Sequence, residues 1–256
     1  MPHAADPATS PSLQIYATLQ RAFDHFNREL FAAKLPPCLL TLRSSARHYG
    51  YHHAERFIAG HGARLDELGL NPGHFITRPV EEVLSTLVHE MVHHWQHHHG
   101  QPTRSNPHNR QWAQHMQGLG LAPSNTGLPG GKPTGRTVSH YILPDGAFLT
   151  SCRALLATGL TLPWMDRHLP TSSGHAERAQ QRQEALRAAG IELQLTPPPL
   201  HALPMQPNGQ SPVVLPVPSR SPDRVKFSCP QCGARAWAAA DTALVCGECE
   251  VGMEGL

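Results

Sequence analysis

Two histidines four residues apart, with a glutamate directly after the first, form the segment His89-Glu90-Met91-Val92-His93. On a helix, residues at this spacing lie about 40° apart around the axis and roughly 6 Å apart along it, so both rings can reach one metal ion. The carboxylate of Glu90 is then close enough to take a proton from a metal-bound water. The pattern therefore predicts zinc-dependent hydrolysis, with His89 and His93 as zinc ligands and Glu90 as the general base.

A catalytic zinc usually has a third protein ligand, which must come from outside this motif. His97 is one turn too far along the helix, and His99 has the metzincin spacing but Gln96 stands where that motif needs glycine. His108 comes 15 residues after the second motif histidine, beyond a short loop and at the expected start of the next helix. We expect His108 to be the third ligand, and His115 is the alternative.

The chain contains 19 histidines, so most of them must have other roles. Five lie on or near the motif helix and are expected on exposed helix surface: His94, His97, His98, His99 and His115. The run 97–99 could take up additional metal in vitro. Trp95 and Trp112 are expected in the core. His140 and Tyr141 are conceivable donors to a tetrahedral oxyanion, but the spacing selects neither.

The motif requires a helix, and the sequence predicts one over 79–99. Apolar residues from Val83 to Trp95 recur at steps of three and four, Pro79 suits the first turn, and Gly100 suits the end. The other expected elements are helices over 12–33 and 106–117, the latter opened by Asn106-Pro107, a strand over 39–42, sheet segments near 49–51, 56–59 and 68–70, a glycine-rich loop over 127–135 and a final strand or two within 137–150. The fold class is α+β.

Four cysteines form two close pairs, Cys229 with Cys232 and Cys246 with Cys249, separated by 13 residues. Two such pairs close a tetrahedral site without an open position, so we expect a structural zinc, and the doubled spacing disfavours a redox pair. The ribbon's hairpin is expected over 236–239 and 243–245, with turns at Gly233 and Gly247. Cys38 and Cys152 are expected to be buried apolar residues.

Composition limits the classes of function. The net charge of +2 is small, and the last 32 residues carry two basic and four acidic side chains, so a nucleic-acid contact would need a local patch. The sequence has no run of 18 apolar residues, so we expect no membrane span. Paired cysteines acting as metal ligands suggest a reducing cytosol, hence a cytoplasmic protein.

The expected organisation follows from the changes in composition along the chain. Residues 1–11 form a disordered lead, and 12–170 form the domain that carries the histidine motif. Residues 171–224 comprise a polar helix near 176–189 and a proline-rich extended linker. Residues 225–256 form the four-cysteine zinc ribbon.

Several short segments together resemble the SprT-like family, which includes the Spartan DNA–protein crosslink proteases. They are the motif followed by His94-Trp95-Gln96, then Asn106-Pro107-His108-Asn109, Trp112, Met116 and Gly118-Leu119-Gly120-Leu121, and upstream 26–31, Leu35-Pro36, Gly50-Tyr51 and Leu70-Asn71-Pro72. The resemblance covers roughly 12–165 and 225–250.

The resemblance implies a small zincin-like, minimal gluzincin metallopeptidase domain followed by a zinc ribbon. It implies that His89, His93 and His108 hold the catalytic zinc, that Glu90 is the base, and that a second zinc is structural. It also implies protein substrates on or near DNA, single-stranded or damaged DNA as an activator, and a role in DNA repair. The rival class is a non-proteolytic nucleic-acid-associated adaptor in which both zinc sites are structural.

Overall fold

A computed structural model describes residues 10–45, 48–103, 105, 107–169, 175–205, 209, 211–213 and 224–255. The chain divides into two compact units, Met1–Leu215 and Pro216–Leu256, which we treat separately. The expected disordered lead falls almost entirely outside the described residues. None of the helices in the described part of the chain combines the length and apolar character that crossing a bilayer requires.

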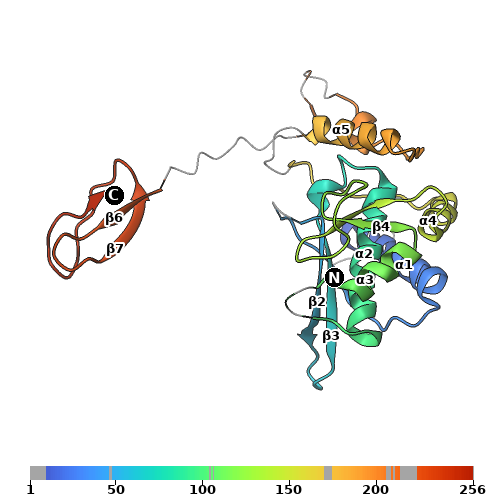
Figure 1. Ribbon diagram of the computed structural model, residues 1–256, viewed down its shortest axis with the longest axis horizontal. Helices are drawn as coiled ribbons and strands as arrows, with labels where there is room; N and C mark the ends of the chain where they lie inside the picture. The colour runs from blue at the N-terminus through green and yellow to red at the C-terminus, as the bar shows by residue number, and fades with distance from the viewer. Residues whose placement is uncertain are drawn as a thin grey trace, which may run out of the picture. The chain divides into compact units, whose positions relative to one another are not determined.

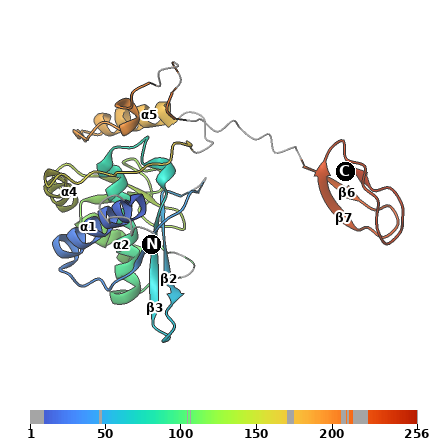
Figure 2. The ribbon, with the colours of Figure 1, turned by 180° about the vertical axis from the view of Figure 1, so that it is seen from behind.

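Helix α2 (Val80–His99) is the centre of the first unit and matches the helix predicted from apolar spacing. It begins after Pro79 and ends at Gly100, which caps it through a backbone bond to Gln96. Its apolar side chains are fully buried along the inner face, among them Leu84, Leu87, Val88, Met91 and Val92. Figures 1 and 2 show α2 with the sheet on one side and helices α1 and α4 on the other. Burial on both sides fixes the position of the motif.

A three-stranded sheet packs against α2. It comprises β1 (Leu39–Leu42), β2 (Gly50–Ile58) and β3 (Arg64–Leu70) in the order β1-β3-β2. β1 runs parallel to β3, whereas β2 pairs antiparallel to it with a register shift between His53 and Phe57. The sequence predicted β1 with its bounds, but it predicted only fragments of β2 and β3. Buried residues at the end of β3 complete the core on this side of α2.

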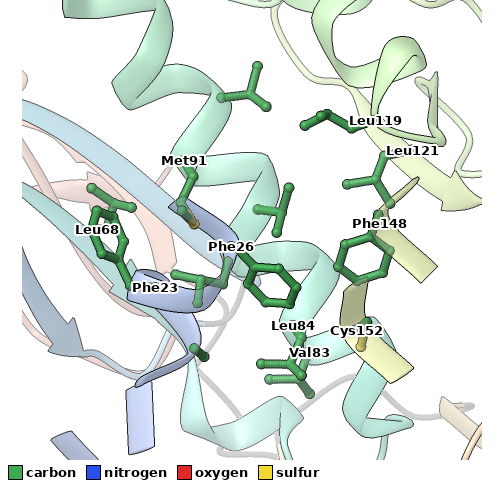
Figure 3. Close-up of a cluster of buried hydrophobic side chains, with 14 of the residues drawn as sticks. Phe23, Phe26, Leu68, Val83, Leu84, Met91, Leu119, Leu121, Phe148 and Cys152 are labelled. Atoms are coloured by element: carbon green, nitrogen blue, oxygen red, sulfur yellow. The ribbon is translucent and has the colours of Figure 1, made fainter. Parts of the chain in front are cut away.

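On the other side of α2, helices α1 (Pro11–Phe31) and α4 (Ala147–Ala157) supply the rest of the core. Figure 3 shows Phe26 of α1, Leu84 of α2 and Phe148 of α4 converging, and the Phe26 and Phe148 ring centroids are 5.6 Å apart. Cys152 is fully buried in this cluster, as expected, whereas Cys38 is only half-buried beside the core. α4 is a correction, because a strand was expected up to residue 150 and only β5 (Ser139–Ile142) forms there.

Helix α3 (Arg110–Gly118) and strand β4 (Leu121–Ser124) follow α2. The side chain of Asn109 caps α3 by accepting a bond from the Trp112 backbone nitrogen at 3.1 Å. The expected cap, Asn106, lies outside the described residues, and the helix begins later than predicted. β4 pairs antiparallel with β5, and Gly120 and Gly146 approach so closely that a side chain on either would meet the other's backbone.

The segment predicted as a polar helix and extended linker is partly packed. α5 (His175–Ala188) forms as expected, and η2 (Pro199–His201) is a single 3₁₀ turn. A similar turn elsewhere in the first unit, η1 (Pro72–His74), follows β3. Leu193 and Leu195 pack on the core, and Thr196 donates two hydrogen bonds to Glu81. These described parts belong to the first unit and do not behave as a free linker.

The second unit is a small antiparallel ribbon of β6 (Arg224–Ser228), β7 (Arg235–Ala239) and β8 (Glu254–Gly255), in the order β7-β6-β8. The expected hairpin between 236–239 and 243–245 is wrong, because β7 pairs with β6 and Val245 makes only an isolated bridge to Gly252. Gly233 has the positive φ that its turn requires, but in the second turn Glu250 takes that role and Gly247 does not.

Candidate metal centre

Three imidazole rings meet beside α2. One ring nitrogen from each of His89, His93 and His108 lies within 4.8 Å of the others. The ring centroids are 5.2 Å apart for His89 and His93, 5.4 Å for His89 and His108, and 4.8 Å for His93 and His108. The indole of Trp112 packs against all three rings at 4.5–5.2 Å and is fully buried. The structure therefore brings the three predicted ligands together, and Trp112 lies in the core as expected.

His108 is held by the glycine-rich loop and not by a helix. It precedes the cap of α3 and forms an isolated bridge to Gly135, whose nitrogen donates to the His108 carbonyl at 3.1 Å. The His108 Nδ1 lies 3.2 Å from the Gly135 carbonyl, so Nδ1–H donates there and Nε2 is left for a metal. Gly135 has a φ of 148°, which favours glycine. His108 was expected at the start of a helix, and this expectation is corrected. The glycine-rich loop instead orients the His108 ring through Gly135.

Gln96, which departs from the metzincin pattern, links α2 to the third ligand. Its Nε2 donates to Asn109 Oδ1 at 2.7 Å, and Asn109 Nδ2 donates to the Gln101 carbonyl at 2.9 Å. Asn109 is the residue after His108, so these bonds fix the chain where the third ring enters. Glycine at position 96 could not make this connection.

His140 supports the first ligand. Its Nδ1 lies 3.2 Å from His89 Nδ1, its Nε2 lies 2.9 Å from Ser85 Oγ, and Ser85 donates to the Glu82 carbonyl. If His89 donates from Nδ1, each group in turn donates to the next, and His89 Nε2 is free to bind a metal. Both His140 nitrogens are occupied in this chain of bonds, so His140 orients a ligand and is not placed as an oxyanion donor.

The variant His140→Ala is expected to bind the metal of this centre about 10- to 100-fold more weakly, because His89 loses the group that orients its ring. Competition with a zinc chelator of known affinity measures the change. Tyr141→Phe, one residue along the same strand, is the matched control and should leave the affinity unchanged. Equal affinities for parent and His140→Ala would remove the supporting role.

The rings are suited to metal binding because burial disfavours their charged forms. Burial lowers the pKa of His89 and of His93 well below the ordinary range, and the neighbouring rings lower it further. Burial also lowers the pKa of His108, in part offset by its backbone bonds to Gly135 and Arg136. Neutral imidazole is the form that binds zinc, so this donor set fits the ion that the motif predicts.

Glu90 lies on the same helix, is 6% exposed, and has its pKa raised by burial to about 8. A carboxyl with a pKa near neutrality can take up and release a proton at physiological pH. Glu90 is a buried carboxyl that follows the first clustered histidine on the same helix. Because Glu90 is buried, its ionisation should make the stability of the metal-free chain depend on pH.

The raised pKa of Glu90 should change how the free energy of unfolding depends on pH. The unfolded Glu90 ionises near 4.5, but the folded group holds its proton up to about 8, so the native state binds more protons between these values. The free energy of unfolding of the metal-free parent should therefore fall as pH rises from about 5 to 8, by up to about 4 kcal/mol relative to Glu90→Gln. Urea denaturation across this range measures the difference, and parallel pH profiles would contradict the shift.

Gly50 on β2 leaves the space that the Glu90 side chain occupies. A Cβ at Gly50 would lie 3.0 Å from Glu90 Oε1, 3.1 Å from Glu90 Cγ and 2.9 Å from Thr86 Cγ2. The backbone of Gly50 is not in the left-handed region, so the constraint is one of space. No local sequence pattern reveals this contact, because Gly50 and Glu90 lie on different elements.

The variant Gly50→Ala is therefore expected to displace the carboxylate and lower kcat about 10- to 100-fold, with zinc content unchanged. Steady-state kinetics of peptide cleavage measure it. Gly60→Ala is the control, because a Cβ there meets nothing within 4 Å. Unchanged kcat in Gly50→Ala would mean that the Glu90 carboxylate tolerates displacement.

The other histidines near the motif differ in how deeply they are buried. His115 stacks on Trp95 with centroids 3.9 Å apart and is not grouped with the three rings in the described structure, so it does not replace His108. His98 and His99 are exposed as expected. The expectation is wrong for His94, which is 0% exposed, because its ring turns inward between α2 and β3. His97 and His115 are half-buried.

The second unit brings its four cysteines together. The sulfurs of Cys229, Cys232, Cys246 and Cys249 all lie within 4.8 Å of one another, and Cys232 and Cys246 are 3.6 Å apart. A tetrahedron with zinc–sulfur bonds of about 2.3 Å has edges of about 3.8 Å, so the set fits a closed zinc site. Backbone N–H groups of Cys232 and Gln231 help lower the pKa of Cys229 to about 7, which favours the thiolate that a metal binds.

Comparison with known proteins agrees with this geometry. The SprT-like family model matches residues 19–130, a range that contains all three clustered histidines and Glu90. An uncharacterized protein encoded in the mucB 3' region of Salmonella typhimurium is 46% identical over 59 residues, which span 23% of this chain and 80% of that protein. The chain belongs to the SprT-like family. This membership assigns it a metalloprotease-like domain with candidate metal-binding groups.

Proposed function

We propose that the protein is a zinc-dependent peptidase whose first unit has a minimal zincin-like active site. The observation that carries the proposal is the convergence of His89, His93 and His108 on one point, with the buried Glu90 following His89 on the same helix. Zinc, when bound there, would polarise a peptide carbonyl and make water more acidic. The family match over this range supports the same assignment.

The protein groups have separate tasks in the proposed reaction. His89, His93 and His108 would hold the metal as neutral rings, with His140 and Gly135 fixing two of them through their second nitrogens. Glu90 would accept a proton from the attacking water and return it to the leaving amine as the peptide bond breaks. Its burial keeps other proton donors and acceptors in the solvent away from the carboxyl.

We propose that the substrates are proteins attached to or lying on DNA, that DNA activates cleavage, and that the protein acts in the cytoplasm in DNA repair. The four-cysteine unit would hold a structural zinc, which makes two zinc ions in the proposed scheme. The ribbon carries more acidic than basic residues, so its whole surface is not suited to bind DNA phosphates. The ribbon would therefore contact DNA through a local basic patch, or would contact a protein.

The direct test is cleavage of a DNA-binding protein by the full chain, with and without single-stranded DNA, followed by gel electrophoresis. We expect cleavage that increases when the DNA is present and stops when a zinc chelator is added. Cleavage that is indifferent to DNA would remove the proposed activator and keep the peptidase. Absence of cleavage under all conditions, with both metals bound, would favour the adaptor.

A further inference from the structure

A second group of imidazoles surrounds Asp66 of β3, separate from the three clustered ligands. Asp66 is 3% exposed, and its Oδ2 lies 2.8 Å from His52 Nε2, 2.7 Å from His94 Nδ1 and 3.2 Å from His98 Nε2. Its other oxygen, Oδ1, accepts the Glu55 backbone N–H at 2.8 Å. One carboxylate oxygen therefore faces three ring nitrogens from two different elements.

The hydrogen bonds of His94 do not balance for a neutral ring. Its Nε2 lies 3.0 Å from the Pro36 carbonyl oxygen and its Nδ1 lies 2.7 Å from Asp66 Oδ2. Both partners accept hydrogen bonds, but a neutral imidazole has a single N–H to donate. With the single N–H of a neutral ring donated to Pro36, His94 Nδ1 turns a lone pair toward Asp66, where a metal ion would satisfy both groups.

The charge of Asp66 suits a metal ligand. Burial acts to raise the pKa of Asp66, but the Glu55 N–H and the His52 and His94 rings outweigh it and hold the pKa below its usual range, so the group is a carboxylate. His52 presents Nε2 to the same carboxylate oxygen, and the tautomer with its proton on Nδ1 leaves a lone pair on Nε2 for a metal. An ionised carboxylate beside a neutral imidazole is a ligand pair for a divalent ion.

We propose that His52, Asp66 and His94 bind a second divalent transition-metal ion in the first unit, with zinc as the most suitable ion. Their ligand atoms all lie within 4.8 Å of one another, and imidazole with carboxylate suits zinc and its neighbours better than magnesium or calcium. His94 Nε2 would keep its bond to Pro36, as a metal-bound histidine commonly bonds a carbonyl through its second nitrogen.

The site would act as a structural brace. It ties β2 through His52 and β3 through Asp66 to α2 through His94. Metal bonds from three elements would hold the two strands to the helix. The His52 ring stacks on that of His93 with centroids 6.5 Å apart, so the brace would also steady a ligand of the first centre.

A shallower set competes for the same carboxylate. Asp66, His97 and His98 also place their ligand atoms within 4.8 Å of one another, but the two rings are more exposed. The inner set is preferred because its ligands are more deeply buried, with His94 fully enclosed. Location of the ion therefore distinguishes the two.

The decisive experiment is a crystal structure of the full chain grown with zinc, with diffraction data collected on both sides of the zinc absorption edge. We expect an anomalous peak among His52, Asp66 and His94, in addition to any at the other centres. A peak confined to Asp66, His97 and His98, or no peak around Asp66, would overturn the proposal.

Solution measurements give an independent check through zinc content after dialysis, determined by elemental mass spectrometry. His52→Ala and Asp66→Asn should each hold one ion fewer than the parent, whereas His53→Ala, an exposed neighbour on β2, should lose none. Added zinc should raise the unfolding temperature of the first unit more in the parent than in either variant. Equal zinc content in parent, His52→Ala and Asp66→Asn would contradict the site.

Discussion

The variant Glu90→Gln is expected to lose about 10³-fold in kcat while it keeps its fold and its metal content. Glutamine has nearly the same shape, so the buried space beside Gly50 stays filled. It cannot accept a proton, so water attack and amine departure lose their acid–base partner. The three imidazoles are untouched, and the metal should stay bound.

The measurement is single-turnover cleavage of a protein substrate on DNA, with metal content determined on the same samples. Glu29→Gln, an exposed position on α1, is the control for the loss of one carboxylate and should cleave at the parental rate. Glu90→Gln that retains parental cleavage would reject the peptidase proposal. Loss of cleavage with unchanged DNA binding would instead reject the adaptor.

The variant Cys229→Ser is expected to unfold the second unit. The described residues of this unit contribute only Phe227 and two cysteines, Cys229 and Cys246, to the buried apolar set. Such a small core cannot offset the entropy of ordering about 30 residues, whereas a four-cysteine zinc site supplies on the order of 10 kcal/mol. Removal of one thiolate should therefore melt β6 and β7 together.

Two-dimensional amide NMR of the full chain measures the effect, because each unit gives its own resonances. In Cys229→Ser the resonances of 224–255 should collapse toward random-coil positions while those of the first unit persist. Cys38→Ser, which changes a half-buried cysteine outside the four-sulfur set, should leave both groups dispersed. Dispersed ribbon resonances in Cys229→Ser would mean that the strands hold without the metal.

Local periodicity predicted the parts of the fold that a single stretch of chain determines. The steps of three and four that bury Leu84, Leu87 and Met91 located α2 almost to the residue. β4 and α4 were missed, because they are short and their burial depends on contacts with distant segments. The ribbon strands were misplaced because the hairpin was expected between the two cysteine pairs, whereas β7 pairs with β6, which lies before the first pair.

The candidate site was likewise predictable from the sequence only where a single stretch of chain determines it. The spacing of His89, Glu90 and His93 was readable because one helix presents all three. His108 was placed near the centre by loop length, but its anchor at Gly135 is 27 residues away and has no local signal. The inward turn of His94 was missed because Asp66, which draws it in, lies on another element.

The central claim is that His108 completes a metal centre with His89 and His93, and counting metal ions tests it most directly. Native mass spectrometry of the full chain should show that His108→Ala holds one zinc fewer than the parent, while His115→Ala, two turns away on α3, holds the parental number. Retention of every ion by His108→Ala, or loss of one by His115→Ala in its place, would contradict the account.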